Sequence, residues 1–183
     1  MKIAIIGAGN MGGAIARGLA KGTIIQTADI CVSNPSKGKL DALKGEFPTM
    51  QVTHSNVEAV KEADIVLLAV KPWYIEPVIK ELPLDTEKQI LVSVAAGISF
   101  EQYEEWVGEK MPVFRVIPNT AISQLESMTL IASHHATKEQ EQLMLDLFNE
   151  MGLAMLIPEK QMAATTALTS CGIAYVLKYI QAA

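Results

Sequence analysis

Short apolar runs recur along this chain, and stretches of helical periodicity separate most of them. The apolar runs are rich in Ile, Val and Leu and predict β-strands at residues 3–6, 30–33, 65–70, 90–94, 113–117 and 129–132. Helical spacing of apolar positions predicts helices at residues 11–21, 37–44, 57–62, 75–81, 100–107 and 138–151. Strands that alternate with helices indicate a mostly parallel sheet. Because the runs are apolar at nearly every position, helices should cover both faces of that sheet.

The pattern changes in the last part of the chain. Residues 161–183 are rich in Ala, lack strand rhythm and place large apolar residues on helical faces. We therefore divide the chain into residues 1–158, which carry the sheet, and residues 159–183, which begin a helical domain. The last helix reaches Ala183 without the Gly, Asn or Pro that usually ends a helix, and its apolar face needs a partner. We expect the chain to be cut short within this domain.

Composition and charge narrow the classes of partner. Half of the 183 residues are hydrophobic, which is enough for a buried core. The net charge of -5, without any cluster of Lys and Arg, argues against nucleic acid as a partner. The longest apolar run, at residues 65–70, is far shorter than the roughly 20 residues that cross a bilayer. Together with two cysteines that form no C-x-x-C motif, this predicts a cytoplasmic protein with no membrane partner.

Three glycines, Gly7, Gly9 and Gly12, lie between the first predicted strand and the first predicted helix. A strand, a G-x-G-x-x-G turn and a helix place the free N–H groups of the helix N-terminus beside a bound pyrophosphate. The first glycine allows the tight turn, the second lets the phosphate approach, and the third lets the helix pack on its strand. The motif predicts a Rossmann-type fold that binds a dinucleotide; the alternative is a glycine turn with a purely structural role.

The end of the second predicted strand bears on the choice between NADP and NAD. NAD-binding folds usually place an Asp or Glu there, on the ribose hydroxyls. This chain has Ser33-Asn34-Pro35-Ser36-Lys37 instead, so hydroxyls, an amide and a cation are available to a 2′-phosphate and no carboxylate repels it. We therefore favour NADP as the cofactor, with NAD as the alternative. The same residues could instead form a polar turn in which Ser36 caps the next helix.

Three further motifs follow the glycine turn in order. They read LLAVKPWYI at residues 67–75, SVAAGIS at residues 93–99 and RVIPNTAISQLESMT at residues 115–129. Together with the glycines they resemble the pyrroline-5-carboxylate reductase family, over essentially the whole chain. The resemblance implies a Rossmann-type domain followed by a helical domain that forms a homodimer or a higher oligomer. It also implies reduction of a small cyclic imine, 1-pyrroline-5-carboxylate, to L-proline with NADPH or NADH.

The resemblance assigns cofactor contacts to three regions of the chain. The glycine turn would hold the pyrophosphate, the end of the second strand would hold the adenine ribose, and the ends of two later strands would form the floor beneath the nicotinamide. Carboxyl ends of parallel strands are the edge at which open α/β sheets bind ligands. The implied cofactor residues are Gly7, Ala8, Gly9, Asn10, Met11, Gly12, Ser33, Asn34, Asn56, Ala69, Val70, Lys71, Pro72, Ala95, Ala96 and Gly97.

Substrate contacts are implied for Pro118, Asn119 and Thr120, which follow a strand, and for Glu159, which precedes a helical stretch of the family. The chain departs from the family at Leu125 and Ser127, which replace glycines, and at Ile173, which replaces a proline. Family members continue past this point with a Ser-Pro-Gly-Gly-Thr-type loop that holds the substrate carboxylate. We therefore expect these 183 residues to bind NADPH but to reduce the imine poorly or not at all.

Titratable side chains do not identify a catalytic acid. The imine nitrogen can enter already protonated, and Lys71, directly before a proline, is expected to be a structural or phosphate-side contact. We expect no metal site. His54 follows a short strand, and the adjacent His134 and His135 should not meet on one metal. Cys31, in an apolar strand, is expected to be an inert core residue.

Two alternatives to this enzyme remain. One is an NADP-binding module without catalysis, which would fit the missing carboxylate loop and Ile173. The other is a different Rossmann imine or keto reductase. Among these, the β-hydroxyacid dehydrogenases use a helical Lys-x-x-x-Asn, but Lys178 is followed at that spacing by Ala182.

Overall fold

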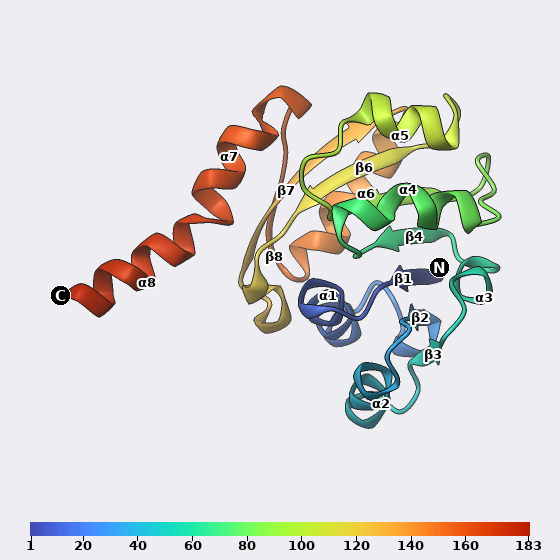
Figure 1. Cartoon of the computed structure of the whole chain (residues 1–183), viewed down its shortest axis with the longest axis horizontal. Helices are drawn as coiled ribbons and strands as arrows, with labels where there is room; N and C mark the ends of the chain where they lie inside the picture. Colours follow the sequence, from blue (N-terminus) through green and yellow to red (C-terminus); the bar gives the residue numbers. More distant parts are fainter.

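The computed structural model describes every residue from Met1 to Ala183 (Figure 1). Its strands are β1 (Ile3–Ile6), β2 (Ile30–Ser33), β3 (Gln51–Thr53), β4 (Ile65–Leu68), β5 (Ile90–Ser93), β6 (Val113–Ile117), β7 (Ser127–His134) and β8 (Gly152–Leu156). Its α-helices are α1 (Asn10–Lys21), α2 (Lys37–Glu46), α3 (Asn56–Val60), α4 (Pro72–Glu81), α5 (Phe100–Val107), α6 (Lys138–Asn149), α7 (Met162–Thr169) and α8 (Gly172–Ala182). Short 3-10 helices are η1 (Thr27–Asp29), η2 (Thr120–Gln124) and η3 (Glu159–Gln161).

All the strands form one sheet in the order β3-β2-β1-β4-β5-β6-β7-β8. Strands β1 to β6 run parallel, β7 is antiparallel to β6, and β8 is parallel to β7. The prediction of a mostly parallel Rossmann-type sheet is therefore confirmed. The strands predicted from the apolar runs are all present. Strand β8 was not predicted, and β3 was expected only as the short strand before His54.

Helices cover both faces of the sheet because alternate residues of each strand point to opposite faces. Ile3 and Ile5 of β1 pack into the core beneath α1, α2 and α6, whereas Ala4 and Ile6 pack into the core beneath α3, α4 and α5. In Figure 1, α4 and α5 lie in front of the strands and α6 lies behind them. The near-continuous apolar runs thus build two cores on one sheet, as the pattern predicted.

The antiparallel strand has a simple cause. Only residues 118–126 connect β6 to β7, and most of them form η2. A parallel neighbour needs a crossover of a dozen or more residues, which this connection is too short to make. Strand β7 therefore turns back beside β6, and its end lies at the opposite edge of the sheet from the end of β6.

The chain leaves the sheet after β8. Helices α7 and α8 extend away from the rest of the molecule at the left of Figure 1, and α8 buries none of its residues. The helical character predicted for the last residues is confirmed. None of the helices combines the length and the apolar content that a membrane crossing requires. The large apolar side chains that these helices expose are Leu168, Ile173, Tyr175, Val176, Leu177, Tyr179 and Ile180.

Candidate functional site

The carboxyl ends of β1, β4 and β5 meet at one edge of the sheet, where the structure has a cavity of about 670 Å³, here called the carboxyl-edge cavity. Pro35, Lys39, Tyr74 and Val94 line it and are not among the predicted cofactor contacts. The other lining residues are predicted cofactor contacts that lie far apart in the chain and are brought together here: Gly7, Gly9, Asn10, Met11, Asn34, Ala69, Val70, Lys71, Pro72, Ala95 and Ala96.

The glycine turn has the steric character that the motif requires. Gly7 has a φ of +105°, and a Cβ added to it would lie 2.7 Å from the carbonyl oxygen of Ala69. A Cβ on Gly12 would collide with the carbonyl oxygen of Gly7. Gly9 is different, because a Cβ there would meet no atom within 4 Å and would project into open space. The protein itself therefore does not require a glycine at position 9. The space beside Gly9, here called the cradle, is open to a ligand.

Helix α1 opens into this cradle. It begins at Asn10, its N-cap is Gly9, no side chain caps it, and its first turn holds no acidic residue. The N–H groups of the first helical turn have no acceptor within the helix, and the helix dipole adds partial positive charge there. Free amides, positive potential and room beside Gly9 fit a pyrophosphate.

Ser33 and Asn34, at the end of β2, form hydrogen bonds with neighbouring polar groups, and Asn34 also binds the glycine turn. The buried amide of Asn34 accepts a hydrogen bond from the N–H of Ala8 at 3.0 Å and donates one to the carbonyl of Ser36 at 3.2 Å. The buried hydroxyl of Ser33 donates to Oδ1 of Asn56 at 2.6 Å. Ser33 and Asn56 do not line the cavity. These side chains therefore fix the shape of the cavity rim from behind.

The cation at this rim is not the predicted one. Lys37 is exposed and lines neither this cavity nor its neighbour, whereas Lys39 lines both. The neighbour, here called the side cavity, has a volume of about 680 Å³ and lies between α1, α2 and η2. Arg17 also lines it but is held by Glu46 in an ion pair of 2.6 Å. Ser36 occupies the N-cap position of α2, although its side chain makes no capping hydrogen bond.

Small, apolar side chains line one end of the carboxyl-edge cavity. This end is formed by Ala69, Val70 and Pro72 after β4 and by Ala95 and Ala96 after β5. The only titratable side chains of the cavity besides Lys39 belong to Lys71, at the N-cap of α4, and to Tyr74. Gly97 does not line the cavity. Such a lining can contact the face of a flat ring.

The predicted substrate residues are divided between different places. Thr120 is exposed and lines the side cavity, together with Ala8. Pro118 and Asn119 are buried, and Asn119 caps η2 by accepting a hydrogen bond from the N–H of Ala121 at 3.0 Å. Glu159 lies outside both cavities, where it forms an ion pair with Arg115 and accepts a hydrogen bond from the N–H of Phe100 at 2.9 Å.

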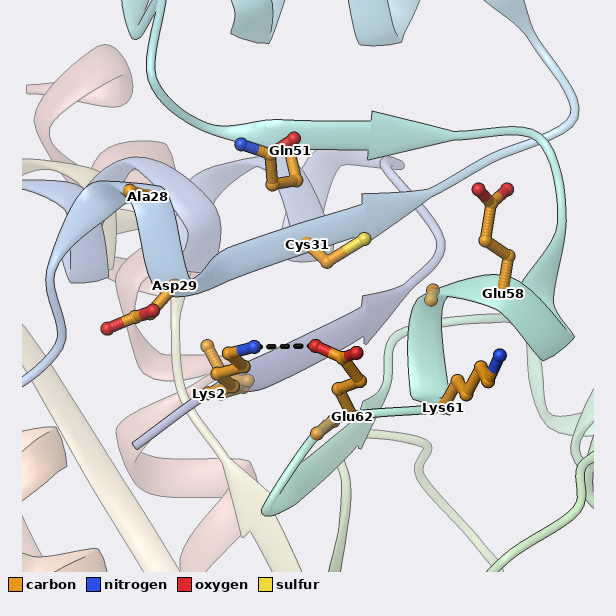
Figure 2. A pocket seen from close by; sticks show the side chains of 11 residues that line it. Lys2, Ala28, Asp29, Cys31, Gln51, Glu58, Lys61 and Glu62 are labelled. Atoms are coloured by element: carbon orange, nitrogen blue, oxygen red, sulfur yellow. Dashed lines mark hydrogen bonds and ion pairs between the residues drawn. The ribbon is translucent and has the colours of Figure 1, made fainter.

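A third hollow lies at the amino edge of the sheet (Figure 2). Lys2 and Glu62 point toward one another across it and form an ion pair of 2.6 Å. Asp29 and Glu58 add two more carboxylates and Lys61 adds a second ammonium group, so three negative charges face two positive ones, a poorer setting for pyrophosphate than the carboxyl-edge cavity, which no carboxylate lines. Cys31 lines this hollow and is half-buried rather than part of the core, and burial, with a smaller effect of Glu58, raises the pKa of its thiol.

The histidines correct one expectation. His134 and His135 do meet, because the Nε2 atoms of both rings contact the same carboxylate oxygen of Glu104. The expectation that the two would not meet rested on their being adjacent in the sequence, and adjacent side chains do point to opposite faces where the backbone is extended. His135 instead has a φ of +54°, which turns its side chain to the side of its neighbour.

The chain is similar to known reductases. The family model described as "NADP oxidoreductase coenzyme F420-dependent" matches residues 2–97. The chain is 37% identical over 185 residues to pyrroline-5-carboxylate reductase of Pseudomonas aeruginosa, with 99% of this chain and 67% of that protein covered. It is 35% identical over 184 residues to pyrroline-5-carboxylate reductase 3 of Danio rerio, with 100% of this chain and 63% of that protein covered.

A solved structure gives the same result. The crystal structure of Plasmodium falciparum pyrroline carboxylate reductase with NADP bound superimposes with a TM-score of 0.89 and 30% identity, and covers 100% of this chain and 67% of that one. The chain therefore spans about two thirds of the length of these relatives.

Proposed function

This chain belongs to the pyrroline-5-carboxylate reductase family, and we propose that it forms the NADPH-binding part of an enzyme that reduces 1-pyrroline-5-carboxylate to L-proline. The observation that carries the proposal is the open cradle at Gly9, at the N-terminus of α1 and inside a cavity lined by most of the predicted cofactor residues. The NADP bound to the Plasmodium falciparum relative supports the same cofactor.

The side chains around the cradle suit NADPH better than NADH. No carboxylate lines the carboxyl-edge cavity, and the ammonium group of Lys39 has no ion-pair partner there. A 2′-phosphate placed near the end of β2 would gain a charge-assisted contact with Lys39 and would meet no negative charge. NADH would lack that contact, so it is the weaker alternative.

The chemistry divides between cofactor and protein. NADPH, when bound, supplies the hydride that an electron-poor imine carbon accepts. The residues of this chain would bind and orient the cofactor: the amides opening α1 would hold the pyrophosphate, and Val70, Ala95 and Ala96 would contact the ring. We assign no residue as a proton donor, because an imine that enters protonated needs none. We further propose Thr120, which lines the side cavity, as a substrate contact.

The helices at the end of the chain suggest how it is divided into domains and how it associates. We propose that residues 159–183 belong to a helical domain separate from residues 1–158. Its exposed side chains on α7 and α8 are as apolar as an interface core, which supports a homodimer or a higher oligomer formed through this domain. We place the protein in the cytoplasm, where small-molecule biosynthesis and reduced cysteines are both expected.

A single substitution tests cofactor binding without disturbing the fold. Gly9→Val fills the cradle, yet the new side chain meets no protein atom within 4 Å of its Cβ, and Gly9 has an ordinary φ of -67°. We expect calorimetry to show NADPH binding to the unmodified chain and binding weaker by about a hundredfold in Gly9→Val, because the phosphate loses its approach to the amides.

Gly45→Ala is the matched control, because a Cβ there also meets nothing within 4 Å and Gly45 lies on α2 outside both cavities. It should bind NADPH as the unmodified chain does. Equal affinity in Gly9→Val and Gly45→Ala would contradict the proposed position of the pyrophosphate.

Turnover separates the enzyme from a binding module. NADPH oxidation should be measured with pyrroline-5-carboxylate, and with a keto acid as the competing substrate class, on the 183-residue chain and on a chain extended to the length of its relatives. Proline formation by the extended chain is expected. NADPH binding with no proline formed would favour a non-catalytic module, and faster reduction of the keto acid would favour another reductase.

A further inference from the structure

Glu104, His134 and His135 gather at the edge of the sheet opposite the carboxyl-edge cavity. His134 is the last residue of β7 and pairs in register with Val113, the first residue of β6. Because β7 is antiparallel to β6, its end lies where the parallel strands begin. Glu104 reaches the same place from α5, so this cluster is separate from the proposed cofactor site.

The ligand atoms of the three residues converge on one point. Nε2 of His134 lies 2.6 Å from Oε2 of Glu104, and Nε2 of His135 lies 3.0 Å from the same oxygen. The two imidazole rings are only 3.9 Å apart between centroids.

The backbone is shaped to produce this convergence. Neighbouring residues in an extended strand point to opposite faces, which would separate the two rings. His135 has a φ of +54°, a left-handed conformation that few residues other than glycine, asparagine, aspartate and histidine adopt. This turn at the end of β7 carries the second ring to the side of the first, so that both face α5.

We propose that Glu104, His134 and His135 bind one divalent transition-metal ion of the zinc class. Two imidazoles and a carboxylate are a ligand set that zinc accepts and that magnesium and calcium do not favour. The three ligand atoms lie within 4.8 Å of one another. A tetrahedral zinc with bonds of about 2.0 Å separates its ligands by about 3.3 Å, so small side-chain rotations are sufficient.

The surroundings suit an accessible ion. The side chains of His134, His135 and Glu104 are 33%, 37% and 34% exposed, which leaves room for water as the fourth ligand. The ring of His134 stacks on Phe100, the first residue of α5, with centroids 5.0 Å apart. An ion here would therefore link α5 to the end of β7 and would stabilise the fold rather than take part in hydride transfer.

The test uses the untagged chain, freed of metal with EDTA and then titrated with zinc chloride by calorimetry. The expected result is one zinc ion per chain and a higher unfolding temperature in its presence. His135→Gly removes a ligand while suiting the φ of +54°, and Glu104→Gln removes the charge while keeping the shape. Each should weaken zinc binding by about tenfold or more.

His54→Asn is the matched control, because His54 is the one remaining histidine of the chain and lies far along the sequence from the cluster. It should bind zinc as the unmodified chain does. In the unmodified chain, zinc should shift the imidazole ¹⁵N resonances of His134 and His135 but not those of His54, a readout that requires no variant to fold. No saturable binding, unchanged affinity in His135→Gly, or a shift at His54 would overturn the proposal.

Discussion

Lys37 and Lys39 lie only two positions apart on α2, yet their surroundings differ. Lys37 and Lys39 both follow β2, but only Lys39 lines the carboxyl-edge cavity and the side cavity, at the place where the two meet. Lys37 is the first residue of α2 and points to solvent. Because residues two apart on a helix lie on different faces, one lysine faces the ligand site and the other does not.

This placement predicts a difference between the two lysines in cofactor preference. Lys39→Gln should weaken NADPH binding by about three- to tenfold at low salt and leave NADH binding nearly unchanged, because only NADPH carries the 2′-phosphate. Lys37→Gln should change neither affinity. Titration of both variants with both cofactors checks this, and a larger effect of Lys37→Gln would show that the phosphate lies elsewhere.

Individual residues were predictable where a short motif specifies them. Gly7 and Gly12 are required by a close contact within the turn and by contacts with Ala69, which follows the neighbouring strand β4, and the G-x-G-x-x-G motif alone implied them. Lys39 and the meeting of His134 with His135 depend on a helix face and on one left-handed residue, which the letters do not reveal. Leu125 keeps a φ of +63° at a position where the family resemblance implied glycine, so the backbone conformation is retained without the residue that favours it.

At the scale of elements, the carboxylate of Glu150 links the end of α6 to the segment that follows α1. Glu150, at the C-cap of α6, accepts hydrogen bonds from the N–H of Thr23 at 2.7 Å and of Ile24 at 3.2 Å, just after α1. Burial alone would raise the pKa of Glu150, but the hydrogen bonds from Thr23 and Ile24 outweigh it and hold that pKa below its usual value of 4.5. The ionised carboxylate therefore stabilises the folded state.

Glu150→Gln should lower the free energy of unfolding by about 1 kcal/mol at neutral pH. A depressed folded-state pKa contributes stability that is present above pH 4.5 and is lost as the pH falls through the folded value, so the difference from the unmodified chain should shrink in acid. Urea unfolding at neutral and acidic pH measures this. The exposed Glu109→Gln serves as the control, and a pH-independent difference would contradict the assignment.

Most elements were predictable because apolar runs on a doubly covered sheet leave a strong periodic signal. Strand β8 was not, because its GLAML sequence follows α6 almost directly and continues the apolar pattern of that helix. The antiparallel direction of β7 also escaped prediction, although the short link across η2 contains the information.

At the scale of the molecule, one arm carries a dense set of exposed apolar side chains. Helices α7 and α8 extend from the sheet (Figure 1), and Leu168 and Tyr179 on them are each 76% exposed. Large exposed apolar patches of this kind mark interaction surfaces. The arm and the cofactor cavity lie on different elements, so association and NADPH binding should be separable.

Tyr179→Glu should therefore shift the chain toward the monomer in sedimentation experiments while leaving NADPH affinity unchanged, because a buried carboxylate at an apolar interface is costly. Gln181→Glu adds the same charge at an exposed polar position of α8 and should have the smaller effect. An identical oligomeric state for Tyr179→Glu and the unmodified chain would show that this face is not the interface.

The position of the dinucleotide is tested most directly by two-dimensional ¹H–¹⁵N NMR of the chain during titration with NADPH. We expect the largest shifts at the amides of Asn10, Met11 and Gly12, which open α1, with smaller ones at Ala95 and Ala96. Shifts centred instead on Cys31 and Glu62, at the amino edge of the sheet, would contradict this prediction.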